Sequence, residues 1–134
     1  MTASEIRSVI VEREIPFPPA RIWRALTQPH LIAEWLMQND FQLAPDHRFT
    51  LRGDWGSVDC QVKTIEPDKV LSYSWDAMGL ESTVTWTLTP AGNGTHLRME
   101  QTGFKPDQTQ AYQGAKFGWQ KFFDQLLAVL ARTD

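Results

Sequence analysis

The chain opens with three segments whose apolar positions recur at different spacings. Residues 6–15 read IRSVIVEREI, are rich in β-branched side chains and are followed by prolines, so we predict a strand there. Residues 20–26 and 31–37 instead carry apolar side chains at helical spacing. Pro29 separates these two segments. The pattern therefore predicts one strand followed by two short helices.

The middle of the chain, residues 41–99, alternates between apolar and polar positions. The alternation is interrupted by turn-forming sequences at 45–46, 53–56, 67–68 and 92–94. Each run between them, such as Val84, Trp86 and Leu88 among threonines, predicts a strand with one polar face. Alternation of this kind is typical of an antiparallel sheet. We predict six strands here, and seven with the first segment.

The last segment returns to helical spacing. Asp107 and Gln110 have the spacing of a capping pair at the start of a helix. An apolar stripe then follows one face of that helix, and it consists of Ala111, Ala115, Trp119, Phe122, Leu126, Val129 and Leu130. The order of elements predicts an α+β fold in one domain over residues 1–134, with a seven-stranded antiparallel sheet and helices only on one side.

Composition and charge narrow the class of protein. A chain of 134 residues, 42% hydrophobic and 22% charged, is long enough to build a real core. Its net charge of −3 argues against a nucleic-acid partner. No apolar run is long enough for a transmembrane helix, and the lone Cys60 rules out an internal disulfide. We therefore expect a cytoplasmic protein with no membrane span.

Several stretches carry a family resemblance. They are residues 12–36 (EREIPFPPARIWRALTQPHLIAEWL), 70–75 (VLSYSW) and 83–104 (TVTWTLTPAGNGTHLRMEQTGF), with Gly118-Trp119, Phe122 and Leu126 in the last helix. Together they resemble the START-like (SRPBCC, helix-grip) superfamily, in the branch homologous to the C-terminal domain of the activator of Hsp90 ATPase. The resemblance covers nearly the whole chain.

This resemblance implies a sheet wrapped around the long C-terminal helix, with a deep apolar cavity between them. Members of the superfamily bind lipids, polyketides, hormones or other hydrophobic molecules, and some catalyse cyclisation or hydrolysis. The Hsp90-activating proteins carry an additional N-terminal domain, for which 134 residues leave no room. We therefore do not expect Hsp90 to be a partner.

The first half of the last helix carries small residues, namely Ala111, Gly114, Ala115 and Gly118. Glycine inside a helix costs about 1 kcal/mol relative to alanine, so two of them need a reason. One interpretation is tight packing of the helix on the sheet. The other is a pocket under this half of the helix, with Phe122, Leu126 and Leu130 filling the space under the second half.

We predict that inward-facing side chains line a cavity for a hydrophobic or aromatic small molecule, without a cofactor. The candidates are Trp35, Phe41, Phe49, Trp55, Cys60, Tyr73, Trp75, Met78, Trp86, Met99, Tyr112, Ala115 and Trp119. For each of them the alternative is a plain core position, and Cys60 in particular fits a buried thiol. Trp55, between two glycines, is predicted to close over the cavity as a lid, with Met78 on the opposite rim.

Two other functions remain open from the sequence. A cyclase or hydrolase would need an inward polar group, for which Tyr73, Tyr112, Glu34 and Asp54 are the candidates. An Hsp90-related interaction module would use the outer sheet face or an edge strand. The three histidines show no metal-ligand spacing, so we predict no metal site. A homodimer through an edge strand or a helix also remains open.

Overall fold

The computed structural model describes residues 7–54, 56–77 and 79–132. Within these ranges the predicted α+β class is confirmed, with two short helices after the first strand and a long helix at the end. The elements are β1 (Arg7–Ile15), α1 (Pro19–Thr27), α2 (Pro29–Trp35), β2 (Gln38–Asn39), β3 (Arg48–Gly53), β4 (Gly56–Glu66), β5 (Val70–Ala77), β6 (Leu80–Ala91), β7 (Gly94–Phe104) and α3 (Thr109–Arg132).

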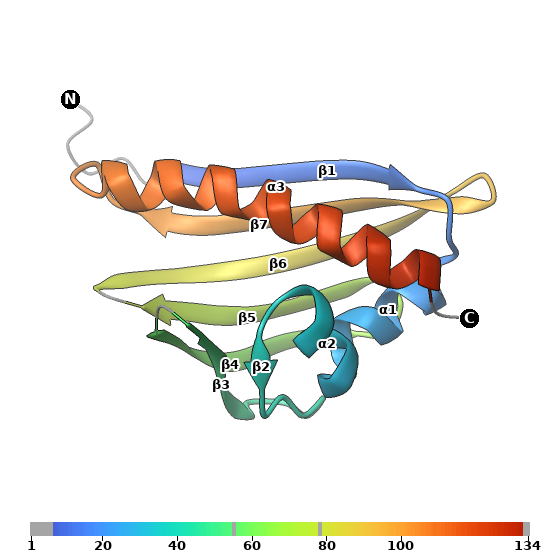
Figure 1. Cartoon of the computed structure of the whole chain (residues 1–134), viewed down its shortest axis with the longest axis horizontal. Coiled ribbons are helices and arrows are strands. Elements are labelled where there is room, and N and C mark those ends of the chain that lie inside the picture. Colours follow the sequence, from blue (N-terminus) through green and yellow to red (C-terminus); the bar gives the residue numbers. More distant parts are fainter. Residues whose placement is uncertain (1–6, 55, 78, 133–134) are drawn as a thin grey trace.

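All seven strands belong to one antiparallel sheet in the order β1-β7-β6-β5-β4-β3-β2. Figure 1 shows α3 lying across this sheet, with α1 and α2 beside its C-terminal end. Side chains alternate across a strand, so one face of β5, β6 and β7 is buried under α3. The core therefore lies between the sheet and the helices.

The strand predicted around Phe41 and Leu43 is wrong in position. The structure instead has a two-residue β2 at Gln38–Asn39. The Asn39 side chain donates to the carbonyl oxygens of Pro29 and Met37 and accepts from the Phe41 N–H at 3.1 Å. These bonds turn the chain after Asn39, so Phe41 is buried while Leu43 is 43% exposed.

The hydrogen bonding at the start of α3 also differs from the prediction, in which Asp107 and Gln110 form a capping pair. The helix begins at Thr109. The side chain of Gln108 accepts from the Lys105 N–H at 2.9 Å, which closes the turn before the helix. The glutamine side chain that bonds the backbone here is therefore Gln108, just outside the helix, and its donor lies in the turn before it.

A bulge near the end of β7 changes which side chains face the core. Thr102 and Phe104 pair with Ser8 and Arg7 of β1, so Gly103 between them is skipped. Gly103 has φ +127°, and a Cβ there would lie 2.5 Å from the carbonyl oxygen of Glu81. Only glycine fits this approach, and the extra residue allows Gln101 and Phe104 both to be buried.

The centre of the core is a cluster of aromatic rings. Trp86 is fully buried and lies 5.6 Å from Trp35, 5.7 Å from Trp119 and 5.6 Å from Phe123 between ring centroids. Its indole N–H donates to the hydroxyl of Tyr73 at 3.0 Å. Trp35 belongs to α2, and Trp119 and Phe123 belong to α3, so the Trp86 ring connects β6 to both helices.

On the outer face, His96 of β7 lies between two carboxylates of β1. Its Nε2 is 2.7 Å from Glu12 and its Nδ1 contacts Glu14. The hydrogen bond to Glu12, and then the one to Glu14, raises the pKa of His96 above its ordinary value of 6.5. Protonated His96 therefore contributes to the stability of the β1–β7 pair.

This arrangement predicts a pH dependence of stability. Because the folded-state pKa is raised, the contribution is fully present below about pH 6.5 and is lost as pH rises through the folded value. We expect His96→Gln to remove this dependence, measured as the free energy of unfolding against pH, while His30→Gln keeps it. An unchanged pH profile in His96→Gln would contradict the assignment.

Candidate ligand-binding pocket

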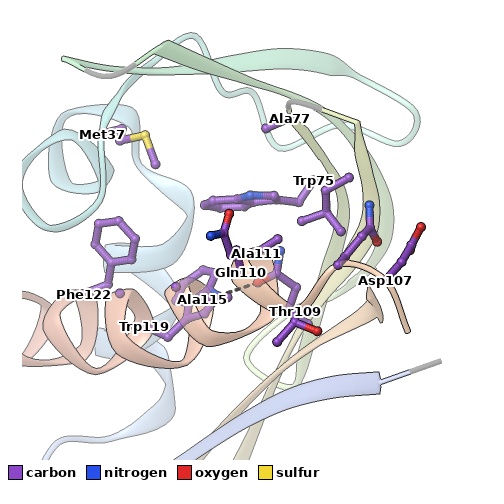
Figure 2. Close-up of a pocket in the computed structure, with 15 residues that line it drawn as sticks. Met37, Trp75, Ala77, Asp107, Thr109, Gln110, Ala111, Ala115, Trp119 and Phe122 are labelled. Atoms are coloured by element: carbon purple, nitrogen blue, oxygen red, sulfur yellow. Dashed lines mark hydrogen bonds between the residues drawn. The ribbon is translucent and has the colours of Figure 1, made fainter. Parts of the chain in front are cut away.

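A pocket of about 720 Å³ opens between the sheet and the first half of α3 (Figure 2). Strands β5, β6 and β7 form one wall, α3 forms the other, and Met37 closes one side. The lining residues are Met37, Trp75, Ala77, Leu80, Gln101, Asp107, Gln108, Thr109, Gln110, Ala111, Gly114, Ala115, Gly118, Trp119 and Phe122. A volume of this size is typical of small-molecule sites.

The pocket exists because α3 changes side-chain size along its length. Gly114 and Gly118 both line it, and a Cβ added at either would meet no described atom within 4 Å. Close packing against the sheet therefore does not explain these two glycines, whereas open space beside them does. Farther along the helix, Phe123, Leu126, Val129 and Leu130 are buried and fill the space against the core.

Large apolar side chains form the deep part of the pocket. The rings of Trp75 and Trp119 lie 5.2 Å apart between centroids at an angle of 52°, and Phe122 packs edge-on against Trp119. In Figure 2, Trp75 lies on the sheet side of the pocket, while Ala111 and Ala115 lie on the α3 side. An apolar wall facing a strip of small residues leaves a space suited to a flat molecule.

A chain of hydrogen bonds runs behind these rings. The indole N–H of Trp119 donates to Gln101 Oε1 at 2.7 Å, Gln101 Nε2 donates to Ser82 Oγ at 3.0 Å, and Ser82 donates to the carbonyl oxygen of Trp75 at 2.7 Å. Both Gln101 and Ser82 are buried. This chain fixes Trp119 against β7 and leaves the Gln101 amide at the pocket wall.

Sequence reasoning missed Gln101. It follows Leu97 and Met99 at the same inward parity of a strand, so a glutamine in that series was the available signal. A polar side chain at a buried position needs partners and often has a specific role. The indole of Trp119 and the hydroxyl of Ser82 are the partners that the sequence could not place.

Polar residues form the rim of the pocket. Four of the lining residues lie around the first turn of α3, namely Asp107, Gln108, Thr109 and Gln110. Asp107 is the only titratable side chain among the described residues that line the pocket. The interior is thus apolar with one buried amide, and charge is confined to the rim.

Of the thirteen predicted ligand-contacting residues, the structure brings Trp75, Ala115 and Trp119 to this pocket. Seven others lie in the buried core and are absent from its lining, namely Trp35, Phe41, Phe49, Cys60, Tyr73, Trp86 and Met99. Trp55 and Met78, predicted as lid and rim, lie outside the described residues. Contact of any of them with a ligand stays a prediction.

Tyr112 lies in a different place from the other candidates. Its ring packs 5.5 Å from Phe104, and Lys116 Nζ lies 5.4 Å from the ring centroid. Tyr112 and Lys116 line a smaller groove of about 310 Å³ between α3 and β1. The helix therefore presents Tyr112 to β1 rather than to the pocket.

Cys60 and Tyr73 lie in an apolar environment beneath the sheet surface. Burial raises the pKa of the Cys60 thiol, and it also raises the pKa of the Tyr73 hydroxyl. Both groups are therefore neutral near pH 7, and Tyr73 accepts the N–H of Trp86. A neutral buried thiol is unreactive, which agrees with a core role for Cys60.

The structure does not gather the four residues considered for acid–base chemistry. Glu34 forms an ion pair with Arg132 at 2.8 Å, and Asp54 is exposed after β3. Neither these two nor Tyr73 and Tyr112 line the pocket. Within the described residues, no group of three or more His, Cys, Asp or Glu side chains is placed to hold a metal ion.

None of the helices in the described ranges is long and apolar enough to cross a membrane.

An open antiparallel sheet packed on one long C-terminal helix, with a pocket between them, defines the START-like, or SRPBCC, class of folds. A family model described as "Activator of Hsp90 ATPase homolog 1-like protein" matches residues 16–131. The chain therefore belongs to this family, and the resemblance seen in the sequence is confirmed.

Solved structures agree with this assignment. Protein MLL2253 from Mesorhizobium loti is 57% identical, with a TM-score of 0.92 over 96% of this chain and 99% of that one. DynU16, a putative protein in the dynemicin biosynthetic locus, is 26% identical, with a TM-score of 0.84 over 93% of this chain and 47% of that one.

A more distant structure shows the fold alone. The Aha1 dimer from Colwellia psychrerythraea is 18% identical, with a TM-score of 0.83 over 92% of this chain and 96% of that one. A search of curated proteins found no match.

Proposed function

We propose that this protein binds a hydrophobic or aromatic small molecule in the pocket between β5–β7 and the first half of α3. The observation that carries the proposal is the open space beside Gly114 and Gly118. Each glycine lowers helix stability by about 1 kcal/mol relative to alanine. No close contact with the sheet offsets that cost, so the space itself is the feature that the glycines preserve.

The lining supports a ligand that is mostly apolar. Trp75, Trp119, Phe122 and Met37 offer flat and adaptable surfaces. Burial of apolar ligand surface against them contributes roughly 25 cal/mol per Å² before the cost of association. The similar structure DynU16, a putative protein in the dynemicin biosynthetic locus, is consistent with this class of function.

The proposal is tested by adding fluorene, a flat hydrocarbon, to ¹⁵N-labelled protein and following the indole N–H signals by NMR. We expect saturable shifts at Trp75 and Trp119, whose rings line the pocket. The signal of Trp23, which is buried in α1, is the internal control and should stay fixed. The absence of saturable shifts at both pocket tryptophans would contradict the proposal.

A further inference from the structure

The orientation of the Gln101 amide follows from its partners. An indole N–H can only donate, so the Gln101 atom 2.7 Å from Trp119 Nε1 is the oxygen. The amide nitrogen therefore faces Ser82 Oγ at 3.0 Å. Since Ser82 uses its one hydrogen to donate to the Trp75 carbonyl oxygen at 2.7 Å, it accepts from Gln101.

The Gln101 amide has one N–H that donates to no acceptor among the described residues. The Nε2 atom carries two hydrogens, and among the described residues it has one acceptor, Ser82 Oγ. Gln101 is 1% exposed and lines the pocket. The second N–H is thus a donor, held at the pocket wall by the bonds on the other atoms of the same amide.

Trp75 supplies a second donor of the same kind. Its side chain is 8% exposed and lines the pocket, and its indole N–H has no acceptor in the described part of the chain. Its backbone carbonyl belongs to the same hydrogen-bond chain as Gln101. Two donors therefore border an otherwise apolar interior, and both lack a protein acceptor there.

We propose that Gln101 and Trp75 select ligands that carry a carbonyl-type oxygen, which accepts from the Gln101 Nε2–H and the Trp75 indole N–H. This inference rests on the proposed function and specifies the ligand class, a flat apolar molecule with an acceptor on its buried part. A pure hydrocarbon would displace water from both donors and replace it with nothing. Sites built to hydrogen-bond a ligand discriminate against analogues that lack the group.

The test compares 9-fluorenone with fluorene on the wild-type protein by calorimetric titration. The two probes share a tricyclic frame and differ by a carbonyl in place of a methylene. We expect the ketone to bind at least about tenfold more tightly, because a single gained hydrogen bond already predicts a factor of this size and the oxygen meets two donors. Equal binding, or tighter binding of the hydrocarbon, overturns the selection by Gln101 and Trp75 and leaves the proposed function standing. Binding of neither probe overturns both.

Two variants test whether Gln101 causes the preference for the ketone over the hydrocarbon. Gln101→Met removes one of the two donors and should lower the affinity ratio of ketone to hydrocarbon toward one, while the Trp75 indole N–H keeps part of the preference. The matched control is Gln110→Met, because Gln110 also lines the pocket but is exposed at the rim. That variant should keep the wild-type ratio. A ratio that is unchanged in Gln101→Met, or lost equally in both variants, overturns the role of Gln101.

A measurement on the wild-type protein covers the case in which Gln101→Met does not fold, since this substitution also removes the acceptor of Trp119. Saturation with 9-fluorenone should move the side-chain NH₂ signal of Gln101 and the indole N–H signal of Trp75 downfield. Saturation with fluorene should not move them in this direction. Equal downfield shifts with both probes would overturn the inference.

Discussion

Replacing Trp86 with alanine is expected to lower the free energy of unfolding by about 3–5 kcal/mol. The side chain is fully buried and touches rings from α2 and α3. Its removal leaves a cavity where three elements meet and strips the Tyr73 hydroxyl of its donor. Neither loss can be repaired by a local shift, because interiors are close-packed and relax only in part.

Equilibrium unfolding in urea measures this effect. Phe117→Ala is the matched control, since Phe117 is an aromatic residue of α3 that is 80% exposed. We expect that control to stay within about 0.5 kcal/mol of the wild type. A loss of less than about 1 kcal/mol in Trp86→Ala would show that this ring does not join the sheet to the helices as described.

Replacing Gly118 with leucine is expected to weaken fluorene binding at least about 100-fold while the protein stays folded. Gly118 lines the pocket, and the space beside it is open, so a leucine side chain has room to enter and occupy the volume proposed for the ligand. Leucine also favours the helix over glycine by somewhat less than about 1 kcal/mol. Loss of binding would thus accompany a gain, not a loss, of stability.

Two further substitutions test whether Gly118→Leu weakens binding because the leucine side chain fills the pocket. Gly118→Ala should raise the free energy of unfolding by about 1 kcal/mol and keep most of the binding, because one methyl group fills little of the pocket. Gln113→Leu places the same leucine side chain at an exposed position of α3 outside the lining and should leave affinity unchanged. Wild-type affinity in Gly118→Leu would contradict the position of the site.

Most of the fold was predictable because its elements have clear periods. The threonine-rich alternation of β6 and the long stripe of α3 each admit one assignment. The position of β2 could not be predicted in this way, because Asn39 turns the chain there. Its side-chain hydrogen bonds to Pro29 and Met37 leave no trace in the pattern of apolar and polar residues. The bulge at Gly103 could not be predicted from the pattern either, since it depends on the close approach of the Gly103 backbone to β6.

The site was predictable in outline and less so in its residues. The alternation along each strand identified side chains that point inward, such as Trp75 and Trp86. It could not show which of them pack against other side chains and which border an empty pocket. That distinction depends on which part of α3 lies opposite each strand. Under Gly114 and Gly118 a pocket remains, whereas Trp86 meets Phe123. Gln101 was missed because its role comes from partners on β6 and α3.

The central claim is that an apolar ligand occupies the space beside the glycines of α3. The most direct test is a set of intermolecular NOEs between bound fluorene and isotope-labelled protein. The account predicts NOEs to the Ala115 methyl group and to the rings of Trp75 and Trp119, which line the pocket. NOEs confined to Tyr112 and Lys116, in the groove between α3 and β1, would contradict it.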